Sequence, residues 1–199
     1  MVSSIKGLNN CIDTDKIKSE TDLSIDVVGN NNHIEFGEGS IANKLRLVLY
    51  GNNHTILIGS DVRLSGLVSI KGTDGGRFCI GKGSSVMGTH FIIGEGQSIT
   101  IGENCMFSWG IEVRATDSHP IFEMDTDNRV NNGEPIQIDD NVWVGQGAAI
   151  LKGTHISSGS VVGIRSLVSG QFSEKNVVIA GVPAKIVKRN IYWKPDLLG

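Results

Sequence analysis

Residues 138–172 read IDDNVWVGQGAAILKGTHISSGSVVGIRSLVSGQF, and in this stretch an apolar side chain returns every six residues. The positions at this spacing are Ile138, Val144, Ile150, Ile156, Val162 and Val168. The positions four residues after each are mostly small: Val142, Ala148, Thr154, Ser160, Ser166 and Phe172. A period of six is not the 3.6-residue spacing of an amphipathic helix. It predicts a solenoid in which each side takes six residues and points its apolar residue inward, so that three sides make an 18-residue coil.

The N-terminal part carries a longer repeat of 22 residues. Its aligned glycines and asparagines are Gly7, Gly29, Gly51, Asn9, Asn31 and Asn53. Because one coil cannot bury its apolar side alone, residues 22 apart are expected to stack in successive coils. The asparagines would then form a column with amides that bond along it. These longer coils are expected to be 18-residue coils with about four extra corner residues. His33 and His54 are out of register with each other, so we expect neither to bind a ligand.

The composition favours short strands joined by tight turns, because the 199 residues include 26 glycines, 4 prolines and few aromatic residues. The formal net charge is −3. Residues 1–135 carry 11 basic and 17 acidic side chains, whereas residues 136–199 carry 7 and 4. This modest basic excess in the C-terminal part suits a small phosphorylated ligand. It does not suit a nucleic acid, which usually requires a strongly basic face.

The cysteines and the N-terminus indicate a cellular location. Cys11, Cys79 and Cys105 are odd in number and lack CxxC spacing, which favours a reducing compartment. The N-terminus has no apolar core of a signal peptide. No run approaches the roughly 18 apolar residues of a membrane-spanning helix. We therefore expect a cytoplasmic protein without a transmembrane segment.

One long segment, residues 115–135, interrupts the repeats. It contains the stretch Thr116-Asp-Ser-His119-Pro120. Functional side chains tend to lie on loops that a rigid scaffold positions. An imidazole with a pKa of roughly 6.5 is suited to take a proton at neutral pH. The sequence therefore predicts that the repeats build a rod and that His119 is a catalytic residue beside it.

Three motifs in this order resemble one protein family. They are Asp117-Ser-His-Pro120, Asn141-Val-Trp-Val-Gly145 and Ala180-Gly-Val-Pro-Ala-Lys185. Together with the hexads they resemble the hexapeptide-repeat acyltransferases, in the branch of galactoside, maltose and capsular polysaccharide O-acetyltransferases. The resemblance covers about residues 79–190 and implies an all-β fold, a left-handed parallel β-helix. We expect this domain over 1–182, with longer coils over 1–80, the loop at 115–135, and a C-terminal tail over 183–199.

The resemblance also implies an activity, which is acetyl transfer from acetyl-CoA to a hydroxyl of a sugar or bacterial surface polysaccharide. His119 would be the general base for direct attack, without a covalent enzyme intermediate and without a metal. Trp143 would line the active-site groove. Either Asp117 or Glu112 would orient the imidazole, or both are solvated acids. Family members assemble as homotrimers with sites in the clefts between parallel rods.

By the same resemblance, the groove for coenzyme A involves backbone amides near Gly145 and Gln146, together with Ile164 and Ser169. Lys185 and Lys188 would meet its phosphates, with Arg189 nearby. The chain has Gly163-Ile-Arg-Ser166 where the family commonly has Gly-Ala-Gly-Ser. Arg165 would therefore reach a phosphate or narrow the groove.

Two other functions stay open on the sequence alone. The same base would also serve an N-acyltransferase that acts on an amino sugar. A non-catalytic solenoid scaffold would suit the Asn-rich coils but leaves the loop histidine and the C-terminal motif unexplained. The acceptor glycan is not specified. Candidate acceptor contacts are His90, Trp109, Phe122, Glu123 and Arg129.

Overall fold

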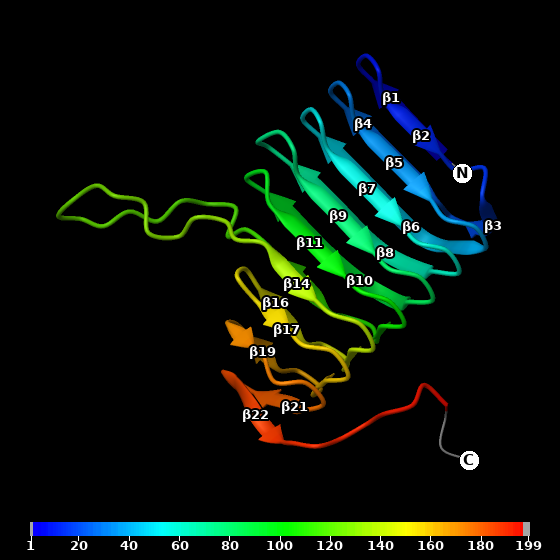
Figure 1. The fold of residues 1–199 in the computed structure, drawn as a ribbon. Helices are drawn as coiled ribbons and strands as arrows, with labels where there is room; N and C mark the ends of the chain where they lie inside the picture. Colours follow the sequence, from blue (N-terminus) through cyan, green and yellow to red (C-terminus); the bar gives the residue numbers. More distant parts are fainter. Residues whose placement is uncertain (1, 197–199) are drawn as a thin grey trace.

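The computed structural model describes residues 2–196, which form a three-sided rod of stacked β-strand coils (Figure 1). All regular elements of this part are strands, 22 in number, and they pair in parallel apart from the last. The predicted left-handed parallel β-helix with one protruding loop is confirmed. Residues 197–199 of the predicted tail lie outside the described residues.

Each coil contributes to three faces in a fixed order. The first face is an eight-stranded sheet of β2 (Cys11–Asp13), β5 (His33–Phe36), β7 (Thr55–Ile58), β9 (Arg77–Ile80), β11 (Ser98–Ile101), β14 (Ile136–Ile138), β17 (His155–Ile156) and β20 (Gln171–Phe172). The second face contains β3 (Ile17–Thr21), β12 (Met106–Phe107), β15 (Trp143–Val144), β18 (Val161–Val162) and β21 (Val178–Gly181). The third face contains β1 (Val2–Lys6), β4 (Ser24–Val28), β13 (Glu112–Arg114), β16 (Ala149–Leu151) and β19 (Leu167–Val168).

Three long strands bend from the second face onto the third. They are β6 (Ser40–Tyr50), β8 (Arg63–Lys71) and β10 (Ser85–Gly94). The last strand, β22 (Ala184–Lys188), folds back antiparallel on β21. Part of the predicted tail is therefore a strand that ends the rod.

The strand register confirms both repeat lengths. His33 pairs with Thr55, 22 residues on, whereas Gln137 pairs with His155, 18 residues on. The extra residues lie at one corner, between the third and first faces. By strand register, Val48 in β6 occupies the same place in its coil as Leu151, the last residue of β16. Strand β6 continues two residues further, to Tyr50. We call this edge of the rod the loop corner, because the long loop leaves from it.

The hexad residues form the core, as predicted. All six are at most 1% exposed, and the small residues four positions on are also buried. Aromatic rings fill the wider N-terminal coils: Phe78 and Phe91 lie 4.8 Å apart between ring centroids, and Phe91 and Phe107 lie 6.1 Å apart.

The asparagine turns stack at the loop corner. Asn9 Nδ2 donates to Asn31 Oδ1 at 3.2 Å, which confirms the first step of the predicted column. The adjacent column, one residue further along each turn, is more continuous. In it Asn32 Nδ2 donates to Asn10 Oδ1 at 3.1 Å, and the His54 amide donates to Asn32 Oδ1 at 2.9 Å. A Cβ at Gly29, where φ is +133°, would collide with the carbonyl oxygen of Gly51. Glycine at the start of these turns therefore allows the coils to approach.

His54 replaces asparagine in the buried column. The side chain is fully buried; Nδ1 accepts from the Gly76 amide at 3.1 Å, and Nε2 faces the Tyr50 carbonyl oxygen at 3.4 Å. This arrangement requires a neutral imidazole with its proton on Nε2. Burial lowers the pKa of His54, because it disfavours the charged form.

We predict that His54 makes the N-terminal coils acid-sensitive. Because the folded pKa is below the unfolded value of roughly 6.5, the contribution of His54 to stability is present above the unfolded value and is lost progressively as pH falls from there through the folded pKa. His54→Asn continues the column, so its unfolding temperature should fall less between pH 7.5 and pH 5 than that of the wild type. His54→Ala should cost roughly 2–4 kcal/mol at neutral pH.

Thermal unfolding of these variants at several pH values measures the effect, with His33→Asn on the first face as the matched control. An identical pH dependence of His54→Asn and wild type would contradict the assignment.

Candidate active site

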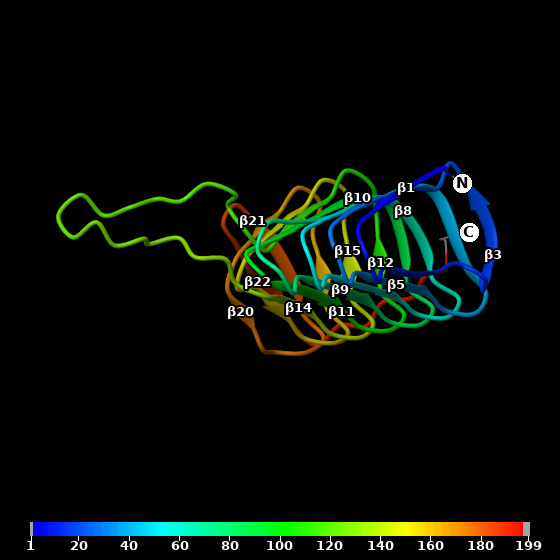
Figure 2. The same ribbon diagram turned by 90° about the horizontal axis from the view of Figure 1, so that it is seen from above.

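The long loop leaves the rod after β13 and returns at β14 (Figures 1 and 2). It extends away from the body as a hairpin, in which the Val130 amide donates to the Ile121 carbonyl and the Glu123 amide to the Asn128 carbonyl. Its tip presents apolar side chains to solvent, with Met124 fully exposed and Phe122 about half exposed. Only the base of the loop contacts the coils.

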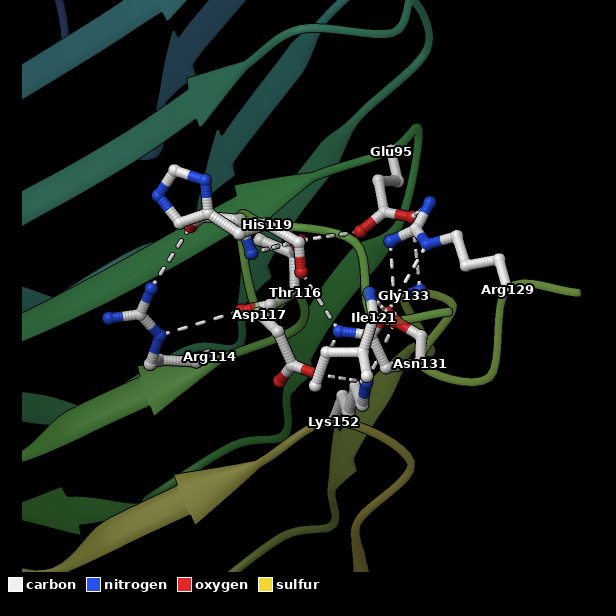
Figure 3. Close-up of polar contacts among 11 residues, drawn as sticks. Glu95, Arg114, Thr116, Asp117, His119, Ile121, Arg129, Asn131, Gly133 and Lys152 are labelled. Carbon is white, nitrogen blue, oxygen red and sulfur yellow. Dashed lines mark hydrogen bonds and ion pairs between the residues drawn. The ribbon is translucent and has the colours of Figure 1, made fainter. Parts of the chain in front are cut away.

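Asn131 ties the two arms of the loop together (Figure 3). Its Nδ2 donates to the His119 carbonyl oxygen and to Asp117 Oδ2, each at 2.9 Å. Its Oδ1 accepts from the Ile121 amide at 2.7 Å. Asn131 is only 8% exposed. The side chain therefore fixes the backbone on both sides of His119.

Glu95 holds the same base from the preceding coil (Figure 3). Its carboxylate accepts from Thr116 Oγ1 at 2.6 Å and from the Gly133 amide at 3.1 Å, and it pairs with Arg129 Nη1 at 2.8 Å. The hydrogen bond from Arg129 is the main cause that lowers the pKa of Glu95 to about 2. Glu95 is therefore ionised at neutral pH and binds both arms of the loop.

The two acids considered as partners of the imidazole are occupied elsewhere. Asp117 accepts from Lys152 Nζ at 2.5 Å, and this bond lowers its pKa. Glu112 accepts from Arg114 Nη1 at 2.7 Å. The His119 side chain is exposed and makes no hydrogen bond among residues 2–196. Within this chain the loop fixes the histidine through its backbone and not through a carboxylate.

A hollow of about 320 Å³ opens beside the loop base on the third face. It is lined by Lys71, Gly72 and Thr73, by Gly94 and Glu95 of the next coil, and by Thr116 and Ser118. His119 directly follows Ser118. The hollow is therefore adjacent to the predicted base.

Trp143 lies on a different side of the rod from His119. It is in β15 of the second face, where it pairs with Met106 and Val161. In a three-sided prism the second face is opposite the loop corner, so the two residues do not meet in one chain. Lys152, in the same coil as Trp143, nevertheless contacts the loop base, because its Nζ donates to the Asn131 carbonyl oxygen at 3.0 Å. The roles predicted for His119 and Trp143 stay predictions.

A residue that the sequence analysis missed packs on Trp143. The ring centroid of Trp193 lies 6.1 Å from that of Trp143, and Trp193 Nε1 donates to the Asn141 carbonyl oxygen at 2.8 Å. The C-terminal segment thus runs back along the rod. The sequence signal was the run Ile191-Tyr192-Trp193 in the C-terminal tail.

Four of the predicted coenzyme residues gather at the corner between the second and third faces. The Arg165 amide donates to the Gln146 carbonyl at 2.9 Å, which stacks the two turns. A Cβ at Gly145 would lie 2.9 Å from the Ile164 nitrogen, so the next coil packs directly on this glycine. Ile164 is 64% exposed. We call this edge the Gln146 corner.

Arg165 is the residue at which the chain departs from the family pattern. Its φ is +54°, in the left-handed region where glycine is at ease and other residues are strained. This is the position at which the family commonly has glycine. The chain thus carries an exposed cationic side chain at a backbone position that disfavours it.

The remaining coenzyme candidates lie in two places. Lys185 and Lys188 are exposed on β22, which returns from the Gln146 corner along β21. Ser169 follows β19 at the end of the third face and therefore lies at the loop corner. Ser169 and the Gln146 turn thus lie at opposite edges of the third face.

Other surfaces do not coincide with these residues. A hollow of about 590 Å³ lies on the first face around Glu35, Leu57, Arg77 and Cys79, and it contains none of the predicted site residues. Residues 2–196 hold no group of three or more His, Cys, Asp or Glu side chains placed to bind a metal ion.

In the same part of the chain no helix has the length and apolarity to cross a membrane.

Comparisons with known proteins agree on one kind of enzyme. The chain is 38% identical to the polysialic acid O-acetyltransferase of Neisseria meningitidis over 189 residues, which cover 94% of this chain and 87% of that one. It aligns with the crystal structure of the polysialic acid O-acetyltransferase OatWY at a TM-score of 0.93 and 34% identity, covering 100% and 93% of the two chains. The crystal structure of the polysialic acid-specific acetyltransferase NeuO aligns with a TM-score of 0.86 and 28% sequence identity, covering 98% of this chain and 89% of that one. No protein-family model matches the chain.

We predict that Asn131→Ala loosens the loop base without unfolding the rod. The change removes the acceptor of the Ile121 amide and the donor to the His119 carbonyl, whereas the coil core is untouched. Loss of such a bond corresponds to about a tenfold or greater rise in local opening. Hydrogen exchange of residues 117–131 measures it, with Asn128→Ala at the loop tip as control. Equal exchange rates in the two variants would refute the role of Asn131.

Proposed function

The chain belongs to the hexapeptide-repeat O-acetyltransferases of sugars and polysaccharides, and on that basis we propose that it acetylates a hydroxyl of a sialic acid polymer with acetyl-CoA as donor. The observation that carries this acceptor is the 38% identity, along 94% of the chain, to an enzyme named for polysialic acid. Acetyl-CoA as donor and three free cysteines favour reaction in the cytoplasm.

His119 is the proposed general base. A sugar hydroxyl is a poor nucleophile at neutral pH, and an imidazole can take its proton as the oxygen attacks. The exposed ring of His119 stands on a backbone that Asn131 fixes, next to the hollow lined by Ser118. A fixed backbone with an unpaired ring suits a base, because the ring nitrogen is available to the substrate.

The reaction proceeds by direct attack. The hydroxyl oxygen forms a bond to the thioester carbonyl carbon as its proton moves to His119. Donors fixed in place stabilise the resulting oxyanion. Collapse breaks the carbon–sulfur bond, and the thiolate takes the proton from the imidazolium, which yields the acetyl ester and free coenzyme A.

The Gln146 corner is the proposed donor groove. Its exposed Ile164 and neighbouring Val182 offer apolar surface to the extended pantetheine arm. Arg165, with Lys185 and Lys188 on β22, offers cations to its phosphates. Gly145 and Gln146 line the part of this groove nearest to Trp143. Ser169, at the opposite edge of the third face, belongs to the part of the site that contains His119.

A complete site requires a second copy of the chain. His119 and Trp143 lie on opposite sides of one rod, and the hairpin with Phe122 and Met124 extends into solvent. In a homotrimer of parallel rods, the loop of one subunit would approach the second face and the Gln146 corner of its neighbour. The site then combines His119 of one chain with Trp143 of the other.

We predict that His119→Ala lowers turnover by on the order of 10²-fold or more, because the proton acceptor is lost. Thiol release from acetyl-CoA with polysialic acid as acceptor measures it. The unfolding temperature should stay that of the wild type, since the exposed ring makes no hydrogen bond among residues 2–196. His33→Ala is the matched control for loss of an imidazole outside the site. Near-normal turnover of His119→Ala would remove it from the mechanism.

We also predict that two defective variants restore each other. When His119→Ala and Trp143→Ala chains are co-expressed, about a quarter of the sites in a random homotrimer receive both native residues. The mixed oligomer should therefore be more active than either variant alone. If both residues act within one chain, the mixture would show only the average of the two variants.

A further inference from the structure

The third face carries a column of side chains that leads to the loop. Strand register places Lys6, Val28, Tyr50, Lys71 and Gly94 in successive coils. Arg46 lies on the same face, four residues before Tyr50 in β6. These outward positions bring Lys6, Arg46, Tyr50 and Lys71 onto one surface, which we call the third-face strip.

Two hollows mark the ends of this strip. The first is the one beside the loop base, about 320 Å³, with Lys71 and Ser118 in its lining. The second is about 390 Å³ and is lined by Lys6, Arg46 and Tyr50, among others. Tyr50 and Lys71 belong to different hollows but are adjacent in the column, so they join the two.

The ammonium group of Lys71 packs over the ring of Tyr50 and forms no ion pair with a carboxylate among residues 2–196. Its Nζ lies 5.1 Å from the centroid of the Tyr50 ring, within the range of a cation–π interaction. The Tyr50 hydroxyl donates to Asp26 Oδ2 at 2.5 Å, which fixes the ring. Among residues 2–196, the ammonium group forms no ion pair with a carboxylate; neither do Arg46 and Lys6. Asp26 lines the same hollow as Lys6 and Arg46, but it accepts from the Tyr50 hydroxyl and pairs with neither cation. The three cations on this face therefore have no ion-pair partner among these residues and can bind a ligand.

The opposite edge of the rod is less suited to an anionic polymer. The corner between the first and second faces carries Glu38, Asp61 and Glu103, and Glu35 lies on the first face nearby. Carboxylates in such numbers repel a polyanion. A chain that bears a carboxylate on each sugar is therefore disfavoured at this corner.

The geometry points to the third-face strip as the binding track for an anionic polysaccharide acceptor, with Lys71 taking the carboxylate of a sugar close to His119. This inference rests on the proposed function. Strands of successive coils are about 4.8 Å apart, so the five steps from β1 to β13 span about 24 Å. That length accommodates several sugar residues, and it gives the N-terminal coils a role in substrate binding beyond extension of the rod.

The test compares the KM of the full chain for long polysialic acid and for its short oligomers, at low and at moderate salt. Lys71→Ala should raise the KM for the polymer about tenfold or more, as expected for the loss of a hydrogen bond to a charged group, and should weaken its salt dependence. Lys71→Arg should retain most of the affinity. Arg46→Ala should raise the KM for the long polymer more than for an oligomer that reaches only the hollow beside His119.

Lys82→Ala is the matched control, because it removes the same charge from the corner between the first and second faces. If the wild type acetylates the polymer and all three alanine variants have the same KM, the track is wrong while the proposed function stands. If the wild type acetylates neither polymer nor oligomer, the proposed function itself fails, and the track with it.

Discussion

Parallel strands in strict register join each coil to the next, and this constraint determines where the rest of the structure can vary. A parallel ladder is continuous only when every strand occupies the same place in its coil. The inward residues therefore form columns such as Ile34, Ile56 and Phe78 on the first face. A slip by one residue would turn such a column toward solvent. Changes in coil length must consequently occur at corners, where no ladder is interrupted.

One corner takes all the large changes. The Asn-rich turns of the N-terminal coils and the long loop both lie between the third and first faces. A loop at this place rests on polar side chains from the coils on either side, because Glu95 precedes it and Lys152 follows it. The backbone of His119 is thus tied to both neighbouring coils. Such fixed placement matters for a base, since small displacements of a reacting group cost large factors in rate.

The sequence predicted the fold well, because a six-residue period reports directly which side chains point inward. Ile138 through Val168 are buried as their spacing required. It also located the loop and its histidine, where the period fails. It did not predict the contacts of Asn131 or Trp193. Asn131 and His119 both lie in the loop, and Trp193 lies in the C-terminal segment, so these contacts form outside the repeats and depend on side-chain geometry that no period reports. For the same reason the sequence suggested Asp117 as a partner of the His119 imidazole, whereas the structure shows that Asp117 accepts a hydrogen bond from Lys152.

The three-sided shape itself determines how a site can be assembled. A prism places the loop corner opposite the second face, so His119 and Trp143 are on different sides of one rod. The third face lies between them, with the loop corner and Ser169 along one edge and the Gln146 corner along the other. An acceptor that lies along this face would approach His119 from its own chain, whereas a donor at the Gln146 corner would face the loop of a neighbour. Acceptor binding would then depend on residues of a single rod, and acetyl transfer on the contact between two.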